Sequence, residues 1–214
     1  MSGRHAVVVL AAGGSMRLGR PKQLLTRDGE PLVHRMVRLA AGTSPSQLLV
    51  IVGANRDAIA ASLAGLDCAC IANEDWEQGL STSLRVAGSH LSAQADSVLV
   101  LACDQPALEG HHLQALLEGA RSAESGCAAT LHADAPGVPA VVPSAWFDQA
   151  HPAGDRGFGS RLRQFPLETV FGLVASELLL DVDDLQDLGR ARELGWLDGD
   201  GAGVPITRSG APAA

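Results

Sequence analysis

The chain has 214 residues, a formal net charge of −8 and a pI near 5.3. Its length suits one α/β domain with a large buried core. The negative charge argues against a nucleic-acid polymer or an anionic membrane as a partner, because the long-range field of the protein repels both. No apolar run approaches the roughly 18 residues that span a bilayer, and the N-terminal residues lack a signal-peptide pattern, so we expect a cytoplasmic protein.

Apolar runs that suit buried strands alternate with helical patterns along most of the chain. This alternation predicts an α/β fold of three layers, with a mostly parallel, twisted sheet and helices on both faces. The expected strands cover Ala6–Ala11, Leu48–Val52, Ala69–Ala72, Ser97–Ala102, Cys127–His132, Ala140–Pro143, Leu167–Phe171 and Leu178–Val182. The expected helices cover Pro31–Ala41, Ala58–Leu66, Leu80–Ser89, Gly110–Ala123 and Asp184–Leu194.

The domain organisation follows from composition. Residues 1–196 are expected to form a single domain. Within it, residues 133–159 are richer in glycine and proline, which predicts an insertion on the side where a second substrate binds. Residues 197–214 are rich in small residues and proline, and we expect a poorly ordered tail.

The first expected strand leads directly into a loop with three glycines and three cations, LAAGGSMRLGRPK from Leu10 to Lys22. Gly13 and Gly14 are expected to let the backbone turn sharply and approach a ligand, and the amides after them can form an anion-binding concavity. Arg17, Arg20 and Lys22 add positive charge that can reach phosphate oxygens. The loop therefore predicts a binding site for a polyphosphate.

Two better-known phosphate-binding motifs do not fit this loop. Gly14 and Gly19 have the spacing of a P-loop, but Arg20 and Pro21 stand where Lys-Ser/Thr is required. Pro21 would also disturb the helix that a P-loop needs at that point. The dinucleotide-binding pattern G-x-G-x-x-G is absent as well.

A polar segment follows the third expected strand. Asn73 could read a base edge or a ribose, Ser83 could do the same from the first turn of a helix, and Gly79 marks the entry to that helix. A loop with a helix cap explains the same residues equally well.

Carboxylates follow two of the expected strands. Asp104 stands after Ser97–Ala102 and can bind Mg²⁺, or it can cap the helix that starts near Glu109. Asp181 and Asp183 lie at the end of Leu178–Val182 and share one face, so either could meet the same metal. Asp184 is expected to cap the helix after them. The turn Gly154–Gly157 offers Asp155 or Arg156 as a further polar group that could reach a substrate.

In this order, the motifs resemble those of MobA-like nucleotidyltransferases, and in particular those that attach a cytidine nucleotide to the molybdenum cofactor. The similarity extends over about Val7 to Leu194 and implies the glycosyltransferase-A-like, Rossmann-like nucleotidyltransferase fold. It is carried by LAAGGSMRLGRPKQLL, Asn73–Ser83, Leu101–Pro106, Gly137–Ala140, Gly154–Gly157 and Asp181–Asp183.

The resemblance implies a role for each motif residue. Catalytic roles fall to Arg17, Lys22 and Asp104, and Mg²⁺ or Mn²⁺ is held by Asp104 with Asp183, or with Asp181 as the alternative. The implied acceptor-binding residues are Gln105, Pro139 and Asp155. The implied nucleotide-binding residues are Leu10, Ala11, Ala12, Gly13, Gly14, Ser15, Arg17, Lys22, Asn73, Gly79, Ser83 and Asp104.

Ala12 resembles the cytidylyl-transferring branch, because the guanylyl branch usually has glycine there. The implied reaction is the attack of a molybdopterin phosphate on the α-phosphorus of CTP, with release of pyrophosphate, and the implied protein partner is a molybdoenzyme or its maturation factor. Three alternatives stay open: a sugar or polyol phosphate as acceptor, GTP as donor, and a cofactor-delivery protein without catalysis. The last is less favoured, because a carrier does not need Lys22, Asp104 and Asp183 together.

Overall fold

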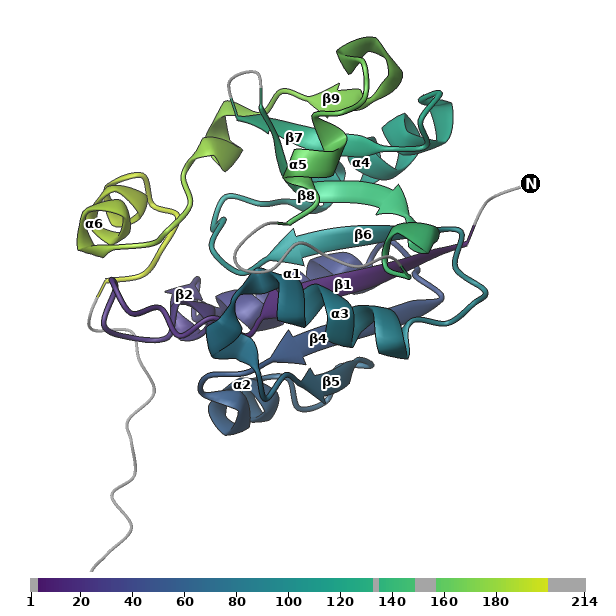
Figure 1. Ribbon diagram of the computed structural model, residues 1–214. Helices are drawn as coiled ribbons and strands as arrows, with labels where there is room; N and C mark the ends of the chain where they lie inside the picture. The colour runs from purple at the N-terminus through teal and green to yellow at the C-terminus, as the bar shows by residue number, and fades with distance from the viewer. Residues whose placement is uncertain (1–3, 133–134, 149–156, 200–214) are drawn as a thin grey trace, which may run out of the picture.

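The computed structural model describes residues 4–132, 135–148 and 157–199, which form one seven-stranded sheet with helices around it (Figure 1). The strand order is β5-β4-β1-β6-β8-β7-β9, and among these strands only β8 runs antiparallel to its neighbours. The mostly parallel sheet is therefore confirmed. Its strands are β1 His5–Ala11, β4 Gln47–Val52, β5 Ala69–Ala72, β6 Ser97–Ala102, β7 Ala128–His132, β8 Ala135–Pro143 and β9 Phe171–Leu173.

The remaining elements are helices, short 3₁₀ turns and one small hairpin. The hairpin pairs β2 Thr26–Arg27 with β3 Glu30–Pro31. The helices are α1 Leu32–Ala41, α2 Arg56–Ser62, α3 Leu80–His90, α4 Gly110–Ser122, α5 Gly159–Leu162 and α6 Leu185–Glu193. The 3₁₀ turns are η1 Lys22–Leu24, η2 Trp76–Gln78, η3 Ser144–Trp146, η4 Leu167–Thr169 and η5 Ser176–Leu179.

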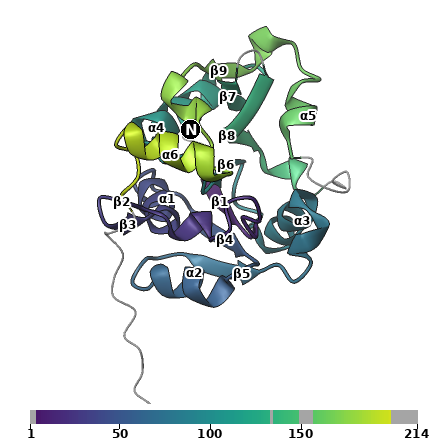
Figure 2. The same cartoon turned by 90° about the vertical axis from the view of Figure 1, so that its left-hand side faces the viewer.

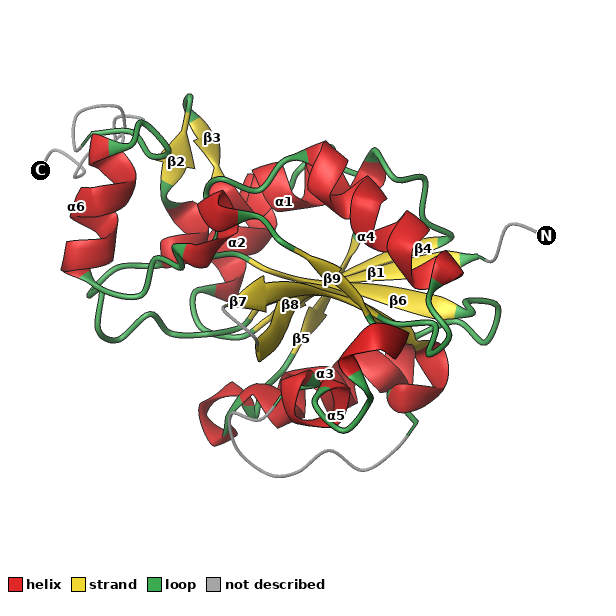
Figure 3. Cartoon of the chain, turned by 90° about the horizontal axis from the view of Figure 1, so that it is seen from above, coloured by secondary structure: helices red, strands yellow, loops and turns green. Residues whose placement is uncertain are grey.

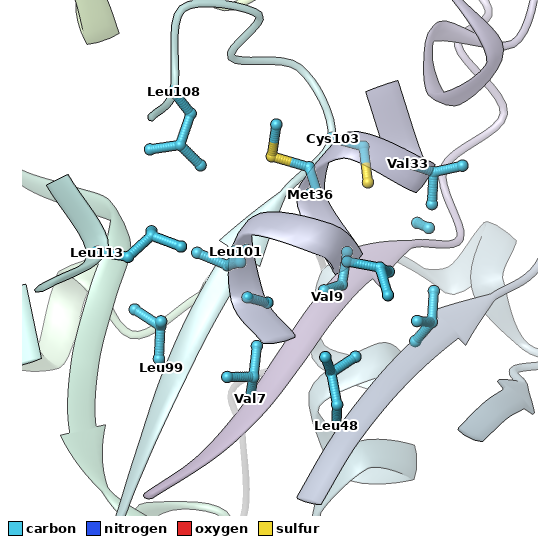
Figure 4. Packing of buried hydrophobic residues seen from close by; sticks show 14 of the residues in the cluster. Val7, Val9, Val33, Met36, Leu48, Leu99, Leu101, Cys103, Leu108 and Leu113 are labelled. Atoms are coloured by element: carbon cyan, nitrogen blue, oxygen red, sulfur yellow. The ribbon is translucent and has the colours of Figure 1, made fainter. Parts of the chain in front are cut away.

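The sheet is covered on both faces, which confirms the three-layer fold. Helices α1, α2 and α4 lie on one side of it and α3 and α5 on the other (Figure 3). Side chains alternate along β1, so Val7 and Val9 pack with Met36 of α1 and Leu113 of α4 (Figure 4), while Val8 joins the cluster on the α3 side. None of the described helices has the length and apolarity that a membrane crossing requires.

Helix α6 stands apart from these layers, at the edge where β1 and β6 end (Figure 2). It closes a small third cluster of buried residues with the glycine-rich loop and the hairpin region: Leu18, Leu25, Leu32, Val182, Leu188, Ala191 and Leu197. Leu197 is thus buried, and Asp198 accepts hydrogen bonds from the backbone N–H groups of Asp28 and Gly29 at 3.0 and 2.9 Å. The packed chain continues through Asp198, beyond the predicted start of the tail, and residues 200–214 lie outside the described part.

One predicted strand, Leu178–Val182, is wrong. Residues 176–179 form η5, and the chain then passes the sheet without joining it. The two neighbours of β6 are β1 and β8, so no place beside it is left. Leu178 and Val182 are both fully buried, but in two different clusters, and this burial produces the apolar pattern that resembles a strand.

The segment predicted as an insertion, residues 133–159, contains a strand of the main sheet. Its described part includes β8, which is longer than the predicted Ala140–Pro143 and lies between β6 and β7. Pro139 has no N–H for the ladder, and the pairing with β7 shifts register between Ala129 and Thr130. The proline and glycine residues of β8 therefore made this strand resemble an irregular segment in the sequence.

Other boundaries differ by smaller amounts. In place of Leu167–Phe171, η4 is followed by β9, which begins at Phe171. Helix α2 begins two residues before the predicted Ala58 and ends at Ser62, and Gly65 has the left-handed φ of +88° in the turn that follows.

Candidate functional site

The glycine-rich loop leaves β1 at the edge where the parallel strands end, which is where such sheets bind ligands. Its left-handed residues are Ser15 and Gly19, with φ of 51° and 72°. The N–H groups of Leu18 and Gly19 both donate to the carbonyl of Ser15, at 3.1 and 3.0 Å. The sharp turn is therefore made at Ser15 and Gly19, and not at Gly13 and Gly14 as the sequence had indicated.

Gly13 and Gly14 serve two different purposes. A Cβ atom on the exposed Gly13 would meet no protein atom within 4 Å, so this position leaves room for a ligand beside the backbone. A Cβ atom on Gly14 would lie 2.9 Å from the ring of Trp76, so this position needs glycine for packing.

Gln23 supports the start of the loop through two hydrogen bonds, and this role was not predicted from the sequence. Its Nε2 donates to the carbonyls of Ala11 and Gly13 at 3.0 and 2.8 Å, and the residue is only 1% exposed. The available signal was a polar side chain between Lys22 and the apolar Leu24.

Lys22 lies between two carboxylates that are far apart in the sequence. Its Nζ donates to Oδ2 of Asp104 at 2.7 Å and to Oδ1 of Asp183 at 2.9 Å. Its side chain and that of Asp104 are both 18% exposed. On the outer side, the 70% exposed Arg17 donates to Oδ2 of Asp183 at 2.8 Å. The structure thus brings together the predicted catalytic pair of cations and two predicted metal ligands.

The protonation states follow from this arrangement. Burial by itself would lower the pKa of Lys22, but the charges and hydrogen bonds of Asp104 and Asp183 outweigh it and raise the pKa above its usual range. Burial would raise the pKa of Asp183, but Lys22 and Arg17 lower it. Lys22 is therefore an ammonium and Asp183 a carboxylate at neutral pH.

Asp181 has a different environment from Asp183. Burial, followed by the charge of Asp104, raises the pKa of Asp181 to about 6, although His132 acts in the opposite direction. Its Oδ1 is buried and has no hydrogen-bond partner among the described residues. Asp181 therefore lies close enough to Asp104 to feel its charge, and among the described residues no ion pair with a lysine or arginine is formed by Asp181.

The segment with Asp181 and Asp183 is fixed by bonds to the chain around Asp104. The N–H of Val182 donates to the carbonyl of Asp104 at 2.8 Å, and Nε2 of the buried Gln105 donates to the carbonyl of Leu178 at 3.2 Å. These two hydrogen bonds fix the segment, which has no backbone ladder of the kind that a sheet strand forms. Asp184 caps α6, as predicted, by accepting from the N–H groups of Gln186 and Asp187.

His112 and Glu177 add a third link between the two segments. The group His111, His112 and Glu177 has its ligand atoms within 4.8 Å of one another, as metal sites do. However, Nδ1 of His112 accepts the N–H of Glu109, the residue that caps α4. Nε2 therefore carries the proton and donates to Glu177 at 2.9 Å. His112 thus connects the two segments, and it has no lone pair left to bind a metal.

Asn73 and Ser83 are both buried and bond to each other. Nδ2 of Asn73 donates to Oγ of Ser83 at 3.0 Å and to Oγ1 of Thr82 at 2.8 Å, and its Oδ1 accepts the N–H of Asp75. Asn73 thus orders the loop before α3, and its contact with a nucleotide stays a prediction, as does that of Ser83. Gly79 caps α3 with a φ of 104°, which favours glycine.

The predicted acceptor residues are placed less completely. Gln105 is buried and also donates to the carbonyl of Val138 at 3.1 Å. Pro139 is buried, and its carbonyl accepts the hydroxyl of Thr130. Asp155 lies outside the described residues. The contact of these three with an acceptor stays a prediction.

The carboxylates suit a hard divalent cation. Asp104 and Asp183 both reach one nitrogen of Lys22, so their oxygens lie close enough to share one ion if the ammonium moves away. Carboxylate oxygens are the ligands that Mg²⁺ and Mn²⁺ prefer. The partnerless oxygen of Asp181 is the alternative ligand.

Known proteins are similar to this chain in sequence and in fold. Residues 7–169 match the family model of the MobA-like NTP transferase domain. The chain is 33% identical over 134 residues to the bifunctional protein GlmU of Rhodococcus opacus (strain B4), and 32% identical over 132 residues to nicotine blue oxidoreductase of Paenarthrobacter nicotinovorans. These alignments cover 59% and 61% of this chain but 27% and 64% of the relatives, so the chain spans less than two-thirds of the length of either.

Among solved structures, that of Rv0371c from Mycobacterium tuberculosis H37Rv superimposes with a TM-score of 0.75 at 27% identity, over 90% of this chain and 100% of the other. A structure of the same protein in complex with manganese gives a TM-score of 0.72 at 26% identity, over 89% of this chain and 98% of the other. Because the family model covers most of the chain, this protein belongs to the MobA-like nucleotidyltransferase family.

Proposed function

We propose that the protein transfers CMP from CTP to the phosphate of molybdopterin and releases pyrophosphate. The observation that carries the proposal is the position of Lys22 between Asp104 and Asp183, directly after a glycine-rich loop. This arrangement supplies the positive charge for a triphosphate and the carboxylates for a divalent cation at one place.

Binding of the triphosphate would exchange partners at Lys22 and Arg17. Both side chains bond to carboxylates, and a triphosphate would offer them oxygens of higher charge. Arg17 is largely exposed and can reach the ligand by rotation of its own side chain. Asp104 and Asp183, once released, would hold Mg²⁺ or Mn²⁺, with Asp181 as the alternative ligand. The bound cation would supply neutralisation of phosphate charge.

The chemical step needs alignment more than proton transfer. An oxygen of the acceptor phosphate forms a bond to the α-phosphorus of CTP, while the bond from that phosphorus to the oxygen of the leaving pyrophosphate breaks. The attacking phosphate is already ionised, so Lys22 and Arg17 act by orientation and charge stabilisation. Cys103, next to Asp104, is no nucleophile here, because burial raises the pKa of its thiol far above neutrality.

The choice of CTP rests on Ala12. This residue is buried next to the loop, and its carbonyl accepts the N–H of Ala54 at 3.0 Å. Its methyl group takes up space that the glycine of guanylyl-transferring relatives leaves free. The test is pyrophosphate release from CTP and from GTP with molybdopterin as acceptor, in the wild type and in Ala12→Gly. We expect a preference for CTP that Ala12→Gly reduces, and a wild-type preference for GTP would contradict the assignment.

The acceptor is tested in the same assay with a panel of sugar and polyol phosphates. We expect turnover with molybdopterin, and activity confined to a sugar or polyol phosphate would exclude it as the substrate. Asp104→Ala is the control for a protein that only delivers the cofactor. The non-catalytic alternative would be favoured if the wild type transferred no nucleotide and the Asp104→Ala variant still delivered the cofactor fully to a molybdoenzyme.

A further inference from the structure

Trp76 occupies a space that exists because two glycines lack side chains. A Cβ atom on Gly14 would lie 2.9 Å from Cζ3 of the indole, and one on Gly53 would lie 2.7 Å from its Cβ and Cγ atoms. Neither distance is possible for real side chains. Gly14 is not among the described residues with a left-handed backbone, so its conformation alone would accept alanine. The indole is therefore the reason for glycine at this position.

The ring joins three segments that follow three neighbouring strands. Gly14 belongs to the loop after β1, Gly53 to the turn after β4, and Trp76 begins η2 after β5. Gly53 also approaches the loop directly, since a Cβ atom there would lie 2.8 Å from the carbonyl oxygen of Ala12. The orientation of the peptide groups from Ala12 to Gly14 thus depends on the place of the indole.

The loop has supports besides Trp76: the N–H of Ala54 donates to the carbonyl of Ala12 at 3.0 Å, and Leu18 is buried in the third cluster. Met16 and Arg17 at its tip are largely exposed, and Gln23 bonds to the loop carbonyls from the side of η1. Trp76, at the start of η2 after β5, provides the contact at Gly14. Trp76 also lines an open surface pocket of about 400 Å³, together with Asn55, Arg56 and Glu74 among others. Removal of the ring would take away the contact at Gly14 and leave this part of the loop free to shift.

We propose that Trp76 is a positioning residue that holds Ala12–Gly14 in the conformation that binds the nucleotide. The inference rests on the proposed binding of a nucleotide by this loop, and it does not depend on the identity of the acceptor. Trp76 does not belong to any of the three buried apolar clusters of the described residues. Its loss should therefore disturb the loop more than the fold.

The test measures the affinity for CTP with Mg²⁺ by calorimetry in wild type, Trp76→Ala and Trp76→Phe. We expect Trp76→Ala to weaken binding about tenfold or more, which corresponds to about 1.4 kcal/mol. Trp76→Phe should restore most of the affinity, because its phenyl ring keeps the contact with Gly53 and part of that with Gly14. Trp196→Ala, which follows α6 and removes an indole packed against the first buried cluster, is the control and should leave the affinity of the folded protein unchanged. Equal affinities of Trp76→Ala and wild type would overturn the proposal.

Two further readouts separate positioning from a general loss of structure. Gly14→Ala should weaken CTP binding in the wild type but much less in Trp76→Ala, because the added methyl group then has no ring to meet. Equal effects in both backgrounds would contradict the proposal. The tryptophan fluorescence of the wild type should change when CTP binds, and Trp76→Phe should lose this change although it still binds. If CTP binds but no acceptor reacts, the proposed reaction fails and the role of Trp76 stands.

Discussion

The N–H of Val182 donates a 2.8 Å hydrogen bond to the carbonyl of Asp104, although 78 positions separate the two residues in the chain. This bond aligns the segment of Asp181 and Asp183 with the end of β6, outside the sheet. Because Asp183 follows Val182 directly, the bond brings its carboxylate to the same nitrogen of Lys22 that Asp104 contacts.

Replacement of Lys22 should separate metal binding from catalysis. In Lys22→Met we expect turnover to fall about a hundredfold or more, because a positive charge at the phosphates is lost. The same variant should bind Mn²⁺ more tightly in the absence of nucleotide, since no ammonium competes for Asp104 and Asp183. Electron paramagnetic resonance titration with Mn²⁺ measures this affinity. Unchanged Mn²⁺ affinity would show that the lysine does not occupy the cation site.

The matched control for this experiment is Arg121→Met. Arg121 is exposed near the end of α4 and lies beside His5 and Asp96, at the edge of the sheet opposite the site. Its loss changes the net charge by the same amount. Both turnover and Mn²⁺ affinity should stay close to the wild-type values, which separates the local effect of Lys22 from that of overall charge.

The three candidate metal ligands can be ranked by amide substitution. Asp104→Asn should raise the Mn²⁺ concentration needed for half-maximal turnover more than any other single change, because Asp104 neighbours both other carboxylates. Asp183→Asn should follow if Asp183 is the second ligand, and Asp181→Asn should then have the smaller effect. The reverse order for the last two would assign the second ligand position to Asp181.

The cap of α6 should contribute to stability. The side chain of Asp184 accepts the N–H groups of Gln186 and Asp187 at 2.8 and 3.0 Å. We expect Asp184→Ala to lower the free energy of unfolding in urea by about 1 kcal/mol. Gln186→Ala, which keeps the cap, is the control and should change stability much less. A loss in the control as large as in Asp184→Ala would mean that the cap contributes nothing specific.

Glu30 should make stability depend on acidity. Its hydrogen bond with Arg38 is the largest of the effects that lower its pKa to about 2, against an ordinary value of 4.5. Because the pKa of Glu30 is lower in the folded state, its contribution to the free energy of unfolding is complete when the pH is above the ordinary pKa of 4.5. This contribution is lost as the pH falls toward the folded-state pKa of about 2. Glu30→Gln should therefore show a shallower loss of unfolding free energy between these two pH values than the wild type. Parallel curves would contradict the prediction.

Much of the site could be predicted from local sequence. The apolar runs of β1, β4 and β6, the periodic helices α1, α3 and α4, and the cap at Asp184 depend on neighbours within a few residues, so the pattern itself carries the information. The glycine-rich loop was recognisable for the same reason. Its position after β1 and its three cations need no knowledge of the rest of the chain.

The tertiary structure decided the parts that depend on distant contacts. It placed Asp183 beside Lys22 without a strand, brought Gln23 and Trp76 into contact with the loop, and inserted the proline-containing β8 into the sheet. Burial can make an isolated segment look like a strand, as at Leu178 and Val182, while proline can conceal a real one. Sequence patterns indicate which residues are buried, but the segments that these residues pack against are determined by the tertiary structure of the whole chain.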